Sequence, residues 1–272
     1  MISLNDIYIA TAVTNNVYKN VVKVMASSFV RNNPNLQLHV YCLNFDSASF
    51  AKYKSGFDLP GVVLHQVEYN NQYTDPTAKG RDSYRAILDC TGVKFKLAND
   101  NVDKEYFMWV DADTVFRRSL SGLEKYLGYK AVYGVSRTKY VTKDETIFNA
   151  GVLIFHKDLL VDILDKYTAY CDKAQAVDLK LLGWSDEHFI RDEFRHKEIL
   201  PLIYNVTPRS RCNVPVICHL VGKITPWTVP LEAIRHMRAP GSSIKELCEA
   251  WLDEYQKAKS LLDEDFIKKV EE

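Results

Sequence analysis

Cysteine pairs of the Cys-x-x-Cys type are absent from this 272-residue sequence. The six cysteines are scattered along the chain, at Cys42, Cys90, Cys171, Cys212, Cys218 and Cys248. Zinc ribbons need closely spaced pairs, so this class of metal site is excluded. The pattern favours buried free thiols in a reducing compartment.

Long apolar runs are missing as well. No stretch approaches the roughly 20 apolar residues that a membrane-spanning helix needs. The segment from Met1 to Asp6 also lacks the basic region and apolar run of a signal peptide. We therefore expect a cytoplasmic protein, with a peripheral position at the inner face of a membrane as the alternative.

Neither sign of charge is in excess. The 35 Lys and Arg residues balance the 35 Asp and Glu residues, so the formal net charge is zero. A chain without a global positive field does not attract nucleic acid over its whole surface. We expect no nucleic-acid partner, and any ligand must be recognised at a local site.

Apolar runs alternate with segments of helical periodicity along most of the chain. Continuous apolar runs are typical of buried parallel strands, and recurrence at every third or fourth residue indicates helices. Strands are expected at 7–13, 36–42, 62–67, 106–110, 131–135, 148–155 and 214–218, and helices at 17–29, 47–54, 87–97, 158–176, 186–194 and from 244 onward. This order predicts an α/β fold with a mostly parallel sheet.

Two aspartates, Asp111 and Asp113, directly follow the apolar run 106–110. The spacing alone carries little weight, because Asp263 and Asp265 share it in a polar stretch where a solvated face is expected. In open α/β sheets, however, ligands bind beyond the carboxyl ends of the strands. Two interpretations remain open for Asp111 and Asp113. They could have a structural role, by capping the next turn or pairing with the nearby arginines 117 and 118, or they could bind a divalent cation such as Mn²⁺ or Mg²⁺.

His219 follows another short apolar run and precedes a glycine. A lone histidine is more often a packed or surface residue, and the other six histidines are interpreted in that way. At a strand end, His219 could complete a site of two carboxylates and one imidazole with Asp111 and Asp113. Such a ligand set favours Mn²⁺ over Ca²⁺.

Three segments together resemble glycosyltransferase family 8, whose retaining enzymes include glycogenin and bacterial lipooligosaccharide galactosyltransferases. They are Phe-Met-Trp-Val-Asp-Ala-Asp at 107–113, Phe-Asn-Ala-Gly-Val-Leu-Ile at 148–154, and His-Leu-Val-Gly at 219–222 with Pro-Trp at 226–227. They occur in the family's order, and the resemblance spans roughly residues 6–227. It implies a single Rossmann-like glycosyltransferase A-type domain at 1–230, with a C-terminal helical extension at 231–272.

The resemblance also implies the ligands. Asp111, Asp113 and His219 would hold Mn²⁺, with Mg²⁺ as the alternative, against the diphosphate of a UDP-sugar donor. Donor contacts are expected from Thr11, Ala12, Asn15, Lys94, Ala112, Asn149, Ala150, Gly222 and Lys223. For Lys94 the competing interpretation is a solvated helix lysine. Gly151 is expected to allow a close backbone approach, with a strand bulge as the competing interpretation of 149–151.

Asp186 and Glu187 are the candidate catalytic residues. They stand at the start of a predicted helix, where the family commonly has an Asp-Gln pair near the reacting carbon. Retention can arise from a covalent carboxylate intermediate or from same-face attack assisted by the leaving group. Glu187 is a better nucleophile than glutamine, but it could equally serve as an acid at a helix N-terminus.

The sequence departs from the family pattern at several donor positions. Thr225 stands where a lysine precedes the Pro-Trp pair, and Lys223 lies two residues earlier. Segment 11–16 lacks the usual acidic residues, and Ser136 or Arg137 replaces an expected aspartate. These departures keep open a nucleotide-sugar-binding pseudoenzyme with a scaffolding role. A sugar nucleotidyltransferase is disfavoured, because no glycine-rich basic loop follows the first strand.

The leading hypothesis is a retaining hexosyltransferase that moves glucose or galactose from a UDP-sugar to a glycan or lipid-linked sugar acceptor. Loops at 70–83, 136–147 and 228–241 are the candidate acceptor segments, because loops on a rigid scaffold usually carry specificity. Residues 231–272 mix both charges without a basic face. They are therefore expected to pack as a helix or form a homodimer contact, and not to anchor the chain to a membrane.

Overall fold

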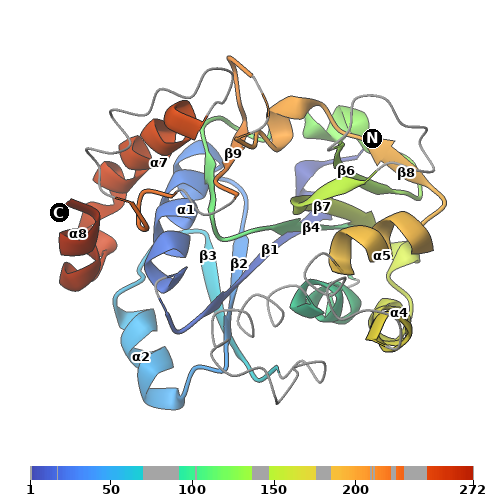
Figure 1. Cartoon of the computed structure of the whole chain (residues 1–272), viewed down its shortest axis with the longest axis horizontal. Helices are drawn as coiled ribbons and strands as arrows, with labels where there is room; N and C mark the ends of the chain where they lie inside the picture. The colour runs from blue at the N-terminus through green and yellow to red at the C-terminus, as the bar shows by residue number, and fades with distance from the viewer. Residues whose placement is uncertain are drawn as a thin grey trace.

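The computed structural model describes residues 2–16, 18–69, 92–101, 103–136, 147–175, 185–208, 210, 212–221, 225–229 and 244–271. A sheet of seven strands runs through the molecule in the order β3-β2-β1-β4-β7-β6-β8 (Figure 1). The strands are β1 (Ile7–Thr14), β2 (Leu38–Leu43), β3 (Val62–Val67), β4 (Tyr106–Val110), β6 (Val132–Ser136), β7 (Phe148–His156) and β8 (Lys197–Ile199). Strand β7 runs antiparallel to β4 and β6, and the other four pairings are parallel. The predicted α/β fold with a mostly parallel sheet is confirmed.

Helices cover both faces of this sheet. They are α1 (Tyr18–Asn32), α2 (Ser47–Ser55), a helix at 92–100, α4 (Ile163–Gln175) and α5 (Ser185–Glu193), with short 3-10 turns η1 (Leu4–Asp6), η2 (Leu123–Tyr126), η3 (Lys157–Leu159) and η5 (Leu202–Tyr204). Alternate residues of β1 point to opposite faces. Ile7 and Ile9 pack in the core beneath α1 and α2, whereas Tyr8 and Ala10 pack in the core formed with the helix at 92–100, α4 and α5.

A separate two-stranded sheet joins β5 (Thr114–Phe116) to β9 (Ile217–His219) in antiparallel register. Helix α7 (Ile244–Ala258) packs against this sheet and against α1. A turn η6 (Lys259–Leu261) and a second helix, α8 (Glu264–Glu271), complete the chain. The small sheet matters because β5 begins directly after Asp113 and β9 ends at His219.

Several predicted boundaries shift for local reasons. Helix α4 begins at Ile163 and not at 158, because Asp162 adopts a left-handed backbone conformation (φ 57°) that a helix cannot contain. The C-terminal helix, expected as one element from 244, is divided into α7 and α8. Strands β5 and β8 are three residues each, too short for a periodicity signal, and were not predicted.

The described cysteines are free: Cys42, Cys171, Cys218 and Cys248 are buried, and Cys212 is partly exposed. Cys90 lies outside the described residues. Burial raises the pKa of the Cys248 and Cys171 thiols to about 11, so these groups stay protonated and unreactive. Among the described residues, no helix combines the length and apolarity that crossing a bilayer requires.

Candidate functional site

Asp111, Asp113 and His219 converge at the carboxyl end of β4. One ligand atom from each residue lies within 4.8 Å of the others. The Nε2 atom of His219 is 3.2 Å from Oδ1 of Asp113 and 3.6 Å from Oδ2 of Asp111. Asp111 and Asp113 do not pair with Arg117, as the alternative interpretation would have it, because Arg117 forms its hydrogen bonds with α7. The three groups form a set of oxygen and imidazole ligands that could hold a divalent metal ion.

Gly151 provides the space that His219 occupies. A Cβ atom at position 151 would lie 1.9 Å from Cε1 of the imidazole and 2.2 Å from Nδ1. Position 151 is in β7, whose carbonyl at this residue accepts a 2.8 Å hydrogen bond from the Asp111 N–H. The expected close approach at Gly151 is present, and its partner is the side chain of His219. The competing interpretation, a bulge, also has support, because the register between β6 and β7 shifts between the pairs Gly134–Leu153 and Ser136–Phe148.

Two buried asparagines determine which imidazole nitrogen of His219 is free. The Oδ1 atom of Asn149 accepts hydrogen bonds from Nδ2 of Asn205 at 2.8 Å and from the Gly151 N–H at 3.2 Å. Nδ1 of His219 lies 3.0 Å from this oxygen and 3.1 Å from Oδ1 of Asn205. Because both neighbours are oxygen acceptors, Nδ1 carries a proton, and Nε2 is the nitrogen that faces the two carboxylates. Outer hydrogen bonds of this kind set the tautomer of metal-binding histidines.

Trp109 orients the first carboxylate. Its indole Nε1 donates a 2.6 Å hydrogen bond to Oδ1 of Asp111, two residues further along the same strand face. Burial raises the pKa of Asp111, against the charges of Lys94 and His219. Burial would lower the pKa of His219, but Asp113 and Asp111 outweigh it and the pKa is raised.

Lys94 is buried, with 2% of its surface exposed, which rules out a solvated helix lysine. Its Nζ pairs with Oδ2 of Asp186 at 2.5 Å, lies 3.4 Å from the Ala150 carbonyl oxygen, and stands 5.4 Å from the ring centroid of Trp109. Burial opposes the charge on Lys94, but Asp186 and Asp111 prevail and raise its pKa. A permanent positive charge thus lies beside the candidate metal group.

Glu187 is buried next to Asp186 at the start of α5. Its Oε1 accepts a 3.2 Å hydrogen bond from the Ala150 N–H, and Oδ1 of Asp186 accepts one of 2.9 Å from the Glu187 N–H. Both acids therefore face the start of β7, where Asn149 and Ala150 were predicted to line the donor sugar. The structure therefore brings the two acids to this edge of the sheet.

The remaining predicted donor residues are distributed around the strand ends. Thr11 and Ala12 are buried in β1, Asn15 is exposed after β1, and Ala112 is partly buried between the two aspartates. Gly222 and Lys223 lie outside the described residues. Thr225, which stands where the resemblance implies lysine, is buried, and its hydroxyl bonds the Thr228 hydroxyl at 2.8 Å. Thr225 therefore stabilises the turn that contains the Pro-Trp pair.

Asn205 was missed by the sequence analysis. It follows η5 and is fully buried, but it belongs to no motif and no periodic segment. It stands between Tyr204 and Val206, and no feature of this short stretch distinguishes it as a site residue.

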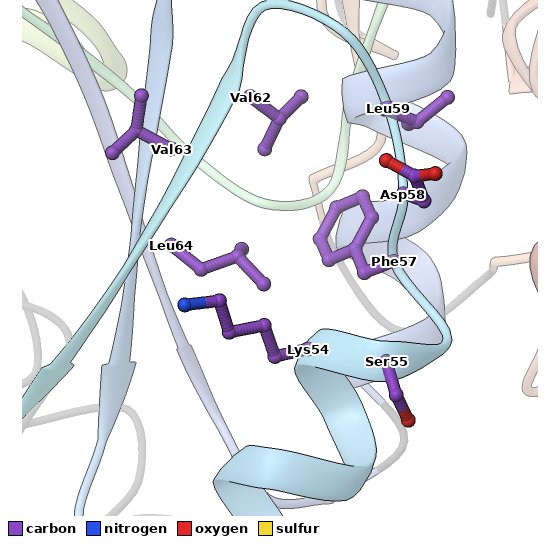
Figure 2. Close-up of a pocket in the computed structure, with 8 residues that line it drawn as sticks. All are labelled: Lys54, Ser55, Phe57, Asp58, Leu59, Val62, Val63 and Leu64. Carbon is purple, nitrogen blue, oxygen red and sulfur yellow. The ribbon is translucent and has the colours of Figure 1, made fainter.

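A hollow of about 450 Å³ lies elsewhere, beside the first residues of β3. It is lined by Lys54, Ser55, Phe57, Asp58, Leu59, Val62, Val63 and Leu64, with Phe57 and Leu64 turned toward each other (Figure 2). These residues lie at the amino end of a parallel strand, whereas the acidic cluster follows a carboxyl end. None of the predicted site residues borders this hollow.

No protein-family model matches the sequence, and no curated protein matches it. Solved structures do match. The galactosyltransferase LgtC, in complex with donor and acceptor sugar analogs, is 18% identical with a TM-score of 0.66 over 96% of this chain and 99% of its own. GlyE from Streptococcus pneumoniae TIGR4 is 15% identical (TM-score 0.63, 96% of this chain, 61% of its own). The bifunctional WbbM apo structure is 12% identical (TM-score 0.59, 94% and 52%). At these identities the similarity shows a shared fold, that of glycosyltransferases.

Proposed function

We propose that this protein is a retaining, metal-dependent glycosyltransferase that moves a hexose from a UDP-sugar to a sugar or glycan acceptor. The observation that carries the proposal is the convergence of Asp111, Asp113 and His219 at a strand end of a glycosyltransferase A fold. LgtC, whose fold this chain shares, was solved with donor and acceptor sugar analogs. The proposal includes the more specific resemblance to glycosyltransferase family 8, which rests on the three sequence segments.

The residues present fit Mn²⁺. Two carboxylates offer hard oxygen ligands, and the tautomer imposed by Asn149 and Asn205 leaves Nε2 of His219 free. When bound, the ion would act as a Lewis acid that stabilises the departing nucleoside diphosphate. Lys94 adds a second positive charge on the same side, held in place by Asp186 and by the face of Trp109.

Asp186 and Glu187 supply the carboxylates for the reacting carbon. Asp186 is paired with Lys94, and Glu187 accepts a hydrogen bond from the Ala150 N–H and also interacts with the charge of Lys94. An active-site mutant of LgtC in which glutamate replaces glutamine has the same fold (16% identity, TM-score 0.64), so the fold accommodates a glutamate in its active site. Nucleophilic attack by Glu187 and same-face attack assisted by the leaving group are the two routes to retention.

The test is a panel of nucleotide-sugars, assayed for hydrolysis and transfer with Mn²⁺ and with a chelator. We expect one UDP-hexose to be turned over with Mn²⁺, and turnover to stop when the metal is chelated. Asp113→Asn should lose this activity, and Asp265→Asn, which removes an exposed acid of the control triplet, should retain it. Donor binding without turnover of any sugar would support the scaffolding pseudoenzyme instead. A cytoplasmic location and a homodimer stay predictions.

A further inference from the structure

The C-terminal helices enclose a third core, separate from the two cores of the main sheet. Its buried members come from α1, β5, β9, the turn after His219, and both C-terminal helices: Val21, Val24, Val115, Val206, Cys218, Leu220, Trp227, Leu247, Cys248, Trp251, Tyr255, Ala258, Leu262, Phe266 and Val270. Figure 1 shows α7 beside α1, with β9 at its upper end. The small sheet, which ends at His219 and begins directly after Asp113, is therefore packed on the C-terminal helix.

The register of the small sheet links this core to the site. Thr114 pairs with His219, and Val115 pairs with Cys218. The Leu220 N–H also donates to the Asp113 carbonyl oxygen at 2.9 Å. Val115 and Cys218 are both buried in the core beneath α7. They form the pair next to Thr114 and His219 in the small sheet. A shift of α7 would therefore displace Asp113 and His219 together.

Arg117 fastens the chain just beyond β5 to α7. Its guanidinium donates to the Ala250 carbonyl oxygen at 3.3 Å, to Oδ2 of Asp253 at 2.6 Å and to Oε1 of Glu254 at 2.9 Å. The Glu254 side chain is only 3% exposed and also pairs with Arg31 of α1. The buried Glu254 carboxylate thus joins α7 to α1 through Arg31, and joins α7 to the chain after β5 through Arg117.

Trp251 of α7 holds the segment that follows β9. Its ring lies 5.1 Å from the ring of Trp227, which in turn meets Tyr18 of α1 at 6.1 Å. Trp227 belongs to the Pro-Trp pair that closes the third motif. Helix α7 therefore contacts the chain after Asp113 and the chain after His219 by two independent contacts, one ionic and one aromatic.

We propose that α7, acting through Arg117 and Trp251, positions the candidate metal ligands Asp113 and His219. The proposal rests on the metal site of the proposed function, and it assigns the C-terminal helix a role in building that site. Arg117 and Trp251 are positioning residues that touch neither ligand side chain. Substitution of Arg117 or Trp251 should raise the Kd for Mn²⁺ by more than the fraction of unfolded protein in each variant accounts for.

The test measures Mn²⁺ affinity of the full chain by electron paramagnetic resonance, which reports the free ion. Arg117→Met should weaken the affinity by about tenfold, the lower end of the range for outer residues of metal sites. Arg117→Lys, which keeps the charge but not the planar fork, should recover part of it. The control is Arg31→Met, which removes the other arginine from the same Glu254 and leaves β5 untouched.

A second pair of variants separates packing from general destabilisation. Trp251→Leu should weaken Mn²⁺ binding, whereas Phe266→Leu on α8, a buried aromatic of the same core, should not. Melting temperatures and circular dichroism verify that every variant is folded at the assay temperature. Equal affinities for the Arg117 and Arg31 variants would overturn the positioning role. A wild-type chain that binds no Mn²⁺ would overturn the metal site itself, and with it this inference.

Discussion

At the scale of single residues, the candidate site depends on side chains that leave room for one another. His219 fills the space above Gly151, and its Nδ1 meets the amide oxygens of Asn149 and Asn205. Trp109 donates to Asp111 from within the same strand. Each of these contacts restricts the direction in which a ligand atom can point.

Replacing Gly151 tests this restriction directly. In Gly151→Ala the new methyl group would overlap the imidazole of His219, and β7 is too deeply buried to move aside. We expect Mn²⁺ binding to weaken by about tenfold or more, measured by titration calorimetry. Gly56→Ala is the matched control, because its Cβ would meet nothing closer than 3.8 Å. Unchanged affinity in Gly151→Ala would show that His219 is not a ligand.

Glu187→Gln distinguishes the two routes to retention. The amide keeps the size of the side chain but cannot attack carbon, so a nucleophilic Glu187 predicts loss of transfer by several orders of magnitude. Same-face attack predicts a small change. The measurement is the steady-state transfer rate with the donor identified by the panel, and Glu193→Gln, an exposed acid at the end of the same helix, is the control. A nearly unchanged rate in Glu187→Gln would rule out the nucleophile.

At the scale of elements, the junction between η6 and α8 is tied to α1. Asp263 and Asn20 exchange two hydrogen bonds of 3.1 Å, and the carboxylate pairs with Lys19 and the buried Lys23. The triplet 263–265 is exposed, as the sequence predicted for a solvated stretch, and yet its first acid docks α8. The same spacing that forms part of a ligand cluster at 111–113 serves a structural contact here.

This junction predicts a pH-dependent stability. Burial would raise the pKa of Asp263, but the bonds from Asn20 and Lys19 and the charge of Lys23 outweigh it, so the folded pKa lies below the ordinary 3.8. A lowered pKa gives stability that is present above pH 3.8 and is lost as pH falls through the folded pKa. Asp263→Asn should therefore lower the melting temperature at neutral pH, and the difference from wild type should shrink below pH 3.8.

The control for this prediction is Asp265→Asn. It also removes a carboxylate from the first turn of α8, but Asp265 forms no ion pair among the described residues. Thermal melts from pH 3 to pH 7 check both variants. Equal losses in the two variants would mean that the charge at the helix end, and not the bonds to α1, stabilises the junction.

At the scale of the whole molecule, metal binding should stabilise the fold, because the ligands come from two distant parts of the chain: Asp111 and Asp113 follow β4, and His219 ends β9. A ligand at about 100 times its Kd adds about 2.7 kcal/mol to the native state. For a chain of this size that corresponds to a rise of roughly 5 °C in Tm. We expect this rise with Mn²⁺ by differential scanning calorimetry, and none in Asp111→Asn. A rise of the same size in that variant would place the ion elsewhere.

Much of the fold follows from local sequence patterns. Apolar runs and helical spacing are properties of neighbouring residues, so the long strands and helices of the main sheet were predictable within a few residues. The acids after β4 were predictable for the same reason, because a buried strand followed by two carboxylates is visible in one short segment. Short elements such as β5 and β8 carry too few residues to show a period.

The sequence by itself determined the α/β class, the acidic strand end and the candidate status of His219. Its resemblance to glycosyltransferase family 8 added Lys94, Asn149 and Asp186 as candidates. Only the tertiary structure decided which of these groups meet. Lys94 and Asp186 are 92 residues apart and form a buried ion pair, and Asn205 lies 56 residues from Asn149. Such contacts form because the crossover connections and the C-terminal helix bring distant segments to one edge of the sheet. No local sequence pattern shows which distant segments will meet.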